Sequence, residues 1–318
     1  MGILILSIVV GFVCLILGAN WLINGATAIA RKYKVSDLII GLTIVAFGTS
    51  APELVVNSIA SSSGLSDIVL GNIIGSNNFN LFVILGVSGL IYPIQVQSST
   101  AWKEIPISIT ITVILFLLLN DFSFAGNYSS LSRINSIIML CLFVLFIIYL
   151  FSQMKKEQDL IPNTVTISTG KSWLKLILGF AGLLVGGHLV VTYSVELATY
   201  LGMSEKIIGL TIVAAGTSLP ELVTSVVAAL KRNSDIAIGN VIGSNIFNIL
   251  LILSISGLIS PIAYNCKFNA EILLLLIGSV LLLVTMYTGK RKKLDRWEAT
   301  LLLLTFIGYT VYVIINEI

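Results

Sequence analysis

The chain has 318 residues, of which 57% are hydrophobic and 10% are charged, and its formal net charge is +3. Its mean hydropathy is +1.03, and because an ordinary soluble domain carries about 25% charged residues, this composition excludes a soluble fold as well as a disordered chain. It predicts a polytopic membrane protein made of helices, since in lipid every backbone polar group must be paired within the chain.

Apolar segments long enough to cross a bilayer, about 20 residues each, follow one another along the sequence. Several contain glycine or proline, which allow a helix to tilt, kink or break. We expect ten spans, at residues 3–30, 36–62, 68–92, 105–120, 131–151, 173–199, 204–230, 236–260, 269–288 and 298–315.

Basic residues are distributed unevenly over the segments between these spans. Fifteen of the 18 Lys and Arg residues follow odd-numbered spans, and only Arg133, Lys206 and Lys267 lie on the other side. Cytoplasmic loops hold the excess of Lys and Arg in membrane proteins. We therefore expect a protein of the plasma (inner) membrane with both termini outside and the linker at 152–172 inside.

The sequence repeats itself at a fixed offset of 168 residues. GLTIVAFGTSAPELV at 41–55 returns as GLTIVAAGTSLPELV at 209–223, and 25 of the 40 positions in 41–80 match those in 209–248. Apolar composition alone does not explain matched Thr, Ser, Pro, Glu and Asn residues. The repeat therefore reflects two related halves of one molecule.

Each half holds five expected spans, and an odd number brings the second half into the membrane from the opposite side. Inverted repeats are typical of secondary transporters, whose substrate site lies where the repeats meet. We expect an all-α protein of ten transmembrane helices in two inverted five-helix repeats, at 1–151 and 173–318, joined by a cytoplasmic linker at 152–172.

Two glutamates lie at matching positions inside apolar spans. Glu53 follows GTSAP and Glu221 follows GTSLP, and a charge at the bilayer centre costs about 2.5–3.5 kcal/mol on insertion scales. Proline breaks a helix and frees backbone carbonyls, while residues three or four positions apart share a helix face. The pattern predicts carboxylate, hydroxyl and carbonyl oxygens at one place, and a plain proline kink is the alternative interpretation.

A second polar stripe lies on the span that follows each glutamate. Residues spaced by four stay close to one face of a helix, and asparagine or serine can donate neutral oxygen ligands or form hydrogen bonds between helices. For Asn72, Asn77, Asn240 and Asn245 we favour the hydrogen-bonding role. The stripes are Asn72, Ser76 and Asn80 in the first half, and Asn240, Ser244 and Asn248 in the second.

All these candidate ligands are oxygen atoms, which hard cations prefer. Ca²⁺ accepts about six to eight oxygens in flexible geometry, whereas Mg²⁺ demands a tight octahedron and keeps its waters. Two carboxylates balance one Ca²⁺, and Na⁺ ions or protons are the alternatives.

The paired motifs GTSAPEL with GNIIGSN and GTSLPEL with GNVIGSN resemble the two repeats of the cation/Ca²⁺ exchanger superfamily. The likeness is greatest to its prokaryotic sodium/calcium antiporters and covers essentially the whole chain. It implies a secondary antiporter, not an enzyme, that exchanges Na⁺ for Ca²⁺ by alternating access. Ca²⁺ export driven by Na⁺ entry is the implied direction, and helices one and six would form a mobile gate.

The resemblance also implies which residues hold the ions. Glu53 and Glu221 would be the main ligands of Ca²⁺ and Na⁺. Several family members, including the potassium-dependent branch, carry an acid in place of Asn248, which argues against coupling to K⁺ here. The remaining implied ligands are Thr49, Ser50, Thr217 and Ser218, the backbone of Ala46 and Ala214, Ser76 and Ser244 at flanking Na⁺ subsites, and Asn80 and Asn248 at the centre.

Two other functions fit parts of the sequence. A Ca²⁺/H⁺ antiporter of the same fold would need only the carboxylates, whereas the Ser and Asn stripes favour Na⁺. A cation channel would also use broken helices and rings of oxygen atoms, but only two glutamates reach the centre. We expect no cofactor, nucleic acid or obligate protein partner; the expected partners are the transported Ca²⁺ and Na⁺ ions and the lipid bilayer.

Overall fold

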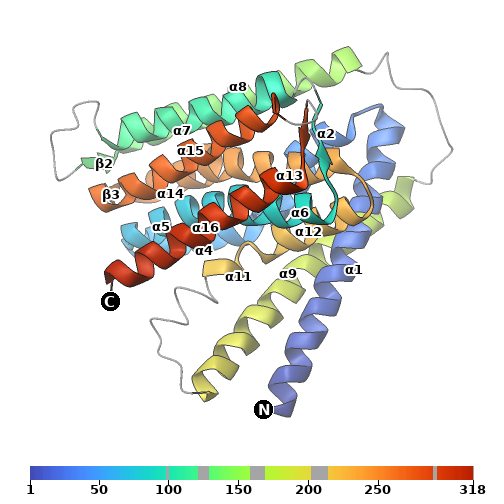
Figure 1. The fold of residues 1–318 in the computed structure, drawn as a ribbon, viewed down its shortest axis with the longest axis horizontal. Coiled ribbons are helices and arrows are strands. Elements are labelled where there is room, and N and C mark those ends of the chain that lie inside the picture. Colours follow the sequence, from blue (N-terminus) through green and yellow to red (C-terminus); the bar gives the residue numbers. More distant parts are fainter. Residues whose placement is uncertain (98–99, 121–128, 158–168, 202–213, 289–291, 318) are drawn as a thin grey trace.

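The computed structural model describes residues 1–97, 100–120, 129–157, 169–201, 214–288 and 292–317, and most of them lie in helices (Figure 1). Seven of the described helices are long and apolar enough to cross a membrane, and a bent pair makes up to eight. The prediction of a helical membrane protein with several spans is confirmed. The first part of the expected span at 204–230 lies outside the described residues.

Helices dominate both halves of the chain. The first half contains α1 (Gly2–Tyr33), α2 (Asp37–Ile40), the π-helix η1 (Gly41–Val45), α3 (Ala46–Thr49), α4 (Ala51–Ser62), α5 (Ser66–Asn78), the π-helix η2 (Phe79–Ile84), α6 (Leu85–Ile91), β1 (Ile94–Gln95), the π-helix η3 (Thr100–Glu104), α7 (Ile105–Leu119), β2 (Ser129–Leu131) and α8 (Arg133–Glu157). The second contains α9 (Thr169–Tyr200), α11 (Ala214–Gly216), α12 (Leu219–Leu230), α13 (Ser234–Phe247), the π-helix η5 (Asn248–Ile252), α14 (Leu253–Ile259), β3 (Ile262–Tyr264), the 3₁₀-helix η6 (Cys266–Phe268), α15 (Asn269–Thr285), β4 (Lys293–Leu294) and α16 (Arg296–Glu317).

Elements 168 residues apart in the sequence have the same local structure. The helices α4 and α12 each have 12 residues, carry a proline in their first turn and begin directly after a serine, Ser50 or Ser218. The π-helices η2 and η5 each begin within one residue of a stripe asparagine, Asn80 or Asn248. Single π turns inside α-helices are frequent at functional sites. The matched helices and π turns show that the repeat in the sequence is also a repeat in the structure.

The continuous helix formed by α13, η5 and α14 is the centre of the molecule. In its most apolar stretch 94% of the residues are buried, compared with 67% for the matching helix of the first half and 22% for α1. A helix that is apolar on all sides packs inside a bundle rather than against lipid. The candidate residues on α13 and η5 therefore lie in the interior of the protein.

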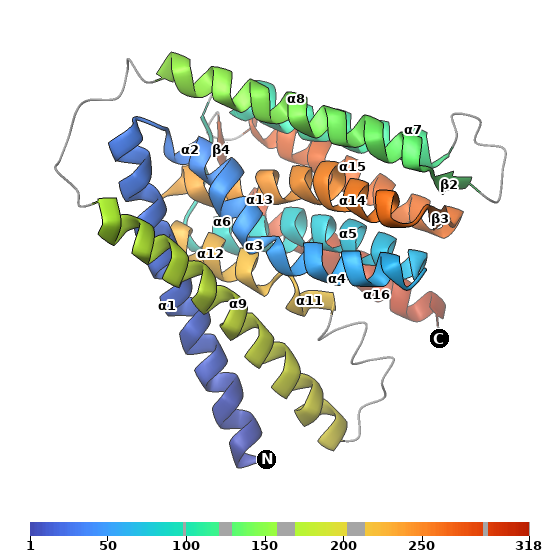
Figure 2. The same ribbon diagram turned by 180° about the vertical axis from the view of Figure 1, so that it is seen from behind.

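The helices α1 and α9 pack side by side and run diagonally away from the other helices (Figures 1 and 2). Glycines let the two backbones touch, as small residues do in membrane helix pairs. A Cβ atom on Gly179 would lie 2.4 Å from the backbone nitrogen of Leu22, and one on Gly18 would lie 2.8 Å from that of Leu183. No larger side chain fits at these positions unless the helices separate.

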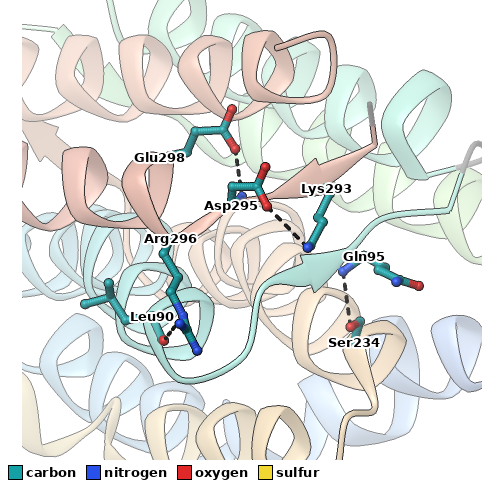
Figure 3. Close-up of polar contacts among 7 residues, drawn as sticks. All are labelled: Leu90, Gln95, Ser234, Lys293, Asp295, Arg296 and Glu298. Carbon is teal, nitrogen blue, oxygen red and sulfur yellow. Dashed lines mark hydrogen bonds and ion pairs between the residues drawn. The ribbon is translucent and has the colours of Figure 1, made fainter. Parts of the chain in front are cut away.

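Loops that the alternation of spans places on one side of the membrane do meet in the structure. The strand β1 pairs with β4, the backbone N–H of Gln95 donates a hydrogen bond of 3.2 Å to Ser234 Oγ (Figure 3), and Arg232 stacks on Tyr92. At the other end β2 pairs with β3, and the N–H of Ala263 donates to Ser66 Oγ. The loops thus form two separate groups.

The β1–β4 group also holds the start of α16 in place. Lys293 and Asp295 form an ion pair of 3.3 Å, while Glu298 Oε2 accepts a 2.7 Å hydrogen bond from the N–H of Asp295. Arg296 Nε donates to the backbone oxygen of Leu90 at 3.1 Å (Figure 3). The basic residues of this loop therefore also have a structural role.

The fourth span and the linker have boundaries in the structure that differ from the expected ones. The fourth expected span, 105–120, begins earlier, at Thr100, because Glu104 is buried and accepts a hydrogen bond of 2.5 Å from Tyr149 on α8. A charged residue that is paired in this way does not end a span. The expected linker at 152–172 is also shortened from both ends, since α8 continues to Glu157 and α9 begins at Thr169.

Substitution of Gly179 by Ala tests the contact between α1 and α9. Alanine normally stabilises a helix by about 1 kcal/mol relative to glycine, but overpacking costs about 1–3 kcal/mol, and here the obstacle is backbone. Gly179→Ala is expected to lower the melting temperature in detergent. Gly170→Ala on the same helix, where a Cβ meets nothing within 4 Å, is the control and should leave it unchanged or higher; equal shifts would contradict the contact.

Candidate functional site

Each candidate glutamate lies just after a break in its helix. Between α3 and α4 the axis bends by 47°, and Ser50 at the break has left the helical conformation, with φ −84° and ψ 8°. Ser218 does the same before α12, with φ −91° and ψ 7°. Proline supplies no N–H to the preceding turn, so the sequences SAPE and SLPE start a new helix at the same position in both halves.

The breaks place both glutamates in the first turn of a helix, Glu53 in α4 and Glu221 in α12. Free backbone N–H groups and the helix dipole make this end electropositive and stabilise a negative group. Both side chains are only 1% exposed, and two like charges buried in one site disfavour each other. The helix ends offset part of the penalty of burying them.

Each half supplies a serine to the glutamate of the other half. Ser50 Oγ donates a hydrogen bond of 2.8 Å to Glu221 Oε1, and Ser218 Oγ donates one of 3.4 Å to Glu53 Oε1. The sequence predicted that Ser50 would share a face with Glu53 in its own helix. The structure instead pairs the residues crosswise, which joins the two breaks into one site.

Asparagines of the stripes hold the neighbouring threonines in the same crosswise manner. Thr49 Oγ1 donates 3.0 Å to Asn240 Oδ1 and 3.2 Å to the backbone oxygen of Ala46. Asn72 Nδ2 donates 3.3 Å to Thr217 Oγ1. The hydrogen-bonding role expected for Asn72 and Asn240 is therefore present, and it fixes candidate ligands.

Asn57 and Ser225 belong to this network and were not predicted. Asn57 Nδ2 donates 2.7 Å to both the backbone oxygen of Glu53 and Asn72 Oδ1, while Asn240 Nδ2 donates 2.9 Å to Ser225 Oγ. Both residues lie four positions after a glutamate and match each other at the offset of 168. A polar residue at both places in an apolar helix was the available signal.

Six of the buried oxygen atoms that have no hydrogen-bond partner among the described residues belong to the candidate ligands. They form three pairs related by the repeat, and an unpaired buried polar atom costs free energy unless a ligand satisfies it. The atoms are Oε2 of Glu53 and Glu221, Oγ of Ser76 and Ser244, and Oδ1 of Asn80 and Asn248.

This arrangement suits hard cations. Among the residues that the structure describes, no three His, Cys, Asp or Glu side chains gather in one place, so a cation here needs hydroxyl and amide oxygens beside the two carboxylates. Such neutral oxygens are ligands for Ca²⁺ and other hard cations. Of the remaining candidates, Ala46 is buried at the start of α3, and Ala214 begins α11.

Comparisons with known proteins agree with this geometry. A family model described as sodium/calcium exchanger protein matches residues 3–152 and 171–315. A putative antiporter, CaxA of Alkalimonas amylolytica, is 38% identical over 95% of this chain and 96% of its own. The sodium/calcium exchanger MaX1 of Methanosarcina acetivorans is 31% identical over 96% and 97%.

A solved structure shares the fold over its whole length. The sodium-calcium exchanger NCX_Mj, soaked with zero Na⁺ and Ca²⁺, superposes with a TM-score of 0.83 at 32% identity, covering 98% of this chain and 100% of that one. Other structures of that exchanger were obtained with Na⁺ and Ca²⁺ or Na⁺ and Sr²⁺. The family model, the relatives and the fold lead to one conclusion: the chain belongs to the sodium/calcium exchanger family.

Proposed function

We propose that this protein is a sodium/calcium antiporter whose ions bind between the two helix breaks. The observation that carries the proposal is the pair of buried glutamates, each hydrogen-bonded by a serine of the other half. Two carboxylates in an apolar interior need a cation beside them. Sodium/calcium exchange is also the activity for which the exchangers that share the family and fold are named.

The proposed ligands follow from the unpaired oxygens. Glu53 and Glu221 supply the charge, and the serine and asparagine oxygens that have no partner among the described residues complete the shell. Ser76 and Ser244 serve flanking Na⁺ subsites, and Asn80 and Asn248 serve the centre. The other proposed contributors are the side chains or backbone of Thr49, Ser50, Thr217 and Ser218 and the backbone of Ala46 and Ala214.

Charge explains why such a site exchanges ions rather than conducting them. One Ca²⁺ or several Na⁺ ions neutralise the two carboxylates, and they compete for the same oxygens. An unloaded site keeps two negative charges, which oppose its passage through a low-dielectric barrier. Only a site that holds ions passes from one side of the membrane to the other, so Ca²⁺ leaves the cell when Na⁺ enters down its gradient.

We further propose that the chain crosses the plasma (inner) membrane ten times, as two inverted five-helix repeats at 1–151 and 173–318 with a cytoplasmic linker at 152–172. Two observations support this: the matched helix breaks at the offset of 168 and the sorting of the loops into two groups. The group that contains β1 and β4 carries most of the basic residues, so it faces the cytoplasm, and both termini lie outside.

Removing one carboxylate charge tests the site. A unit charge pair at 4 Å is worth about 4 kcal/mol at an effective dielectric constant of 20, and about 1.4 kcal/mol is a factor of ten. Glu53→Gln or Glu221→Gln is therefore expected to weaken Ca²⁺ affinity at least about a hundredfold in Na⁺-driven uptake of radiolabelled Ca²⁺ into proteoliposomes. Glu196→Gln, at an exposed position of α9, is the matched control; an unchanged affinity in Glu221→Gln would contradict the proposed site.

The driving ion is tested by imposing gradients separately. In proteoliposomes, a Na⁺ gradient is expected to drive Ca²⁺ uptake, whereas a pH gradient or a K⁺ gradient alone is not, because the hydroxyl and amide oxygens have no role in binding protons. Uptake driven by the pH gradient without Na⁺ would replace the proposal with Ca²⁺/H⁺ exchange. Uptake without any counter-gradient that is carried by single-channel currents would replace it with a channel.

A further inference from the structure

Four asparagines form a hydrogen-bonded chain between the two halves, in the order Asn80, Asn245, Asn77 and Asn248. Asn77 Nδ2 donates 3.2 Å to the backbone oxygen of Asn245, and Asn245 Nδ2 donates 3.3 Å to the backbone oxygen of Asn77. The other amide groups join crosswise, Asn80 Nδ2 to Asn245 Oδ1 at 3.1 Å and Asn248 Nδ2 to Asn77 Oδ1 at 3.0 Å. All four side chains are at most 4% exposed. We call these four residues the amide clasp.

The hydrogen bonds of the amide clasp fix the orientation of the side-chain amides of Asn80 and Asn248, the two outer residues. A backbone carbonyl only accepts hydrogen bonds, so Asn77 must direct its NH₂ to Asn245 and its Oδ1 to the other side. Asn77 Oδ1 then accepts a hydrogen bond from Asn248, so Asn248 must direct its NH₂ group toward Asn77. The same argument, starting from the Asn245 side chain, fixes the orientation of the Asn80 amide. The two outer carbonyl oxygens, Asn80 Oδ1 and Asn248 Oδ1, are then left over, and neither has a partner among the described residues.

The helical segments that carry Asn80 and Asn248 pack against the helices that carry the glutamates. The π-helix η2, which contains Asn80, packs against α12, and η5, which begins at Asn248, packs against α4. Glu221 and Glu53 lie in the first turns of those helices. A reversed amide would present an NH₂ group to a cation, which repels it.

We propose that Asn77 and Asn245 are positioning residues that hold the amides of Asn248 and Asn80 with their oxygens toward the transported ions. The proposal rests on the proposed function, because it concerns how the ligands of that site are oriented. Neither residue touches an ion; each acts on an outer asparagine of the opposite half. The clasp therefore sets affinity for Ca²⁺ from outside the ligand shell.

The same geometry gives a reason for an amide at position 248. An ionised carboxylate there would have no N–H to donate to Asn77 Oδ1, and two acceptor oxygens would face each other. The clasp thus requires an uncharged side chain at position 248, and the negative charge of the site is carried by Glu53 and Glu221.

The experiment is a set of double-mutant cycles, which separate coupled from independent residues. Asn77→Ala and Asn245→Ala are each made in the wild type, in Asn80→Ala and in Asn248→Ala. Na⁺-driven uptake of radiolabelled Ca²⁺ into proteoliposomes gives the KM for Ca²⁺ and the maximal rate for every variant. Asn78→Ala is the matched control, because the buried amide of Asn78 donates to the backbone oxygen of Glu271 and not to the clasp.

We expect Asn77→Ala to raise the KM about tenfold, as the loss of one oriented ligand does, with a smaller change in maximal rate. In the Asn248→Ala background it should change the KM less than about twofold, since its partner is gone. In the Asn80→Ala background its full effect should persist, and Asn245→Ala should show the converse pattern. Asn78→Ala should leave the KM near that of the wild type.

Equal effects of Asn77→Ala in both backgrounds, or a KM as little changed as in Asn78→Ala, would overturn the positioning role while leaving the exchanger intact. If Asn80→Ala and Asn248→Ala themselves leave the KM values for Ca²⁺ and Na⁺ unchanged, the proposed ligand set fails and the inference fails with it. Size-exclusion profiles check folding, and Asn77→Ser and Asn245→Ser take the place of any alanine variant that does not fold.

Discussion

Burial of two carboxylates in an apolar interior is the constraint that the rest of this structure meets. Glu53 and Glu221 are each 1% exposed, and their charges repel. Three features counter the penalty: a helix N-terminus under each glutamate, a serine donor from the opposite half, and neutral oxygens in position to share a cation. The broken helices, the π turns and the rows of asparagine all follow from this requirement.

The site depends on both halves together. Hydrogen bonds that run from one repeat to the other tie its centre together: Ser50 to Glu221, Thr49 to Asn240, Asn72 to Thr217 and Asn80 to Asn245. One repeat alone would leave its glutamate without a donor and its asparagines without partners. Because an unpaired buried polar group is expensive, the two copies of the sequence stabilise each other at the candidate site.

Much of this was predictable from the amino-acid sequence. Composition predicted membrane helices, and the offset of 168 residues predicted the matched breaks before Glu53 and Glu221. Sequence periodicity relates neighbours within one helix, so it predicted Ser50 beside Glu53 and missed its bond to Glu221. For the same reason Asn77 was expected to make an interhelical bond, but its partners Asn245 and Asn248 became known only from the fold.

Hydrogen-bond partners that are distant in the sequence also explain the wrong start of the fourth span and the missed role of Asn57. Glu104 looked like part of a loop because a lone carboxylate ends an apolar segment, whereas in the fold Tyr149 satisfies it and the span continues through it. The role of Asn57 was missed because a single asparagine in a helix is usually structural. Only its bonds to Glu53 and Asn72 show that it supports the site.

The glycine contact between α1 and α9 has a consequence for how these two helices can move. Each helix comes from a different half, and at Gly18 and Gly179 their backbones leave no room for a side chain. Two helices packed this closely move as one unit. Any displacement of α1 relative to the other helices therefore carries α9 with it.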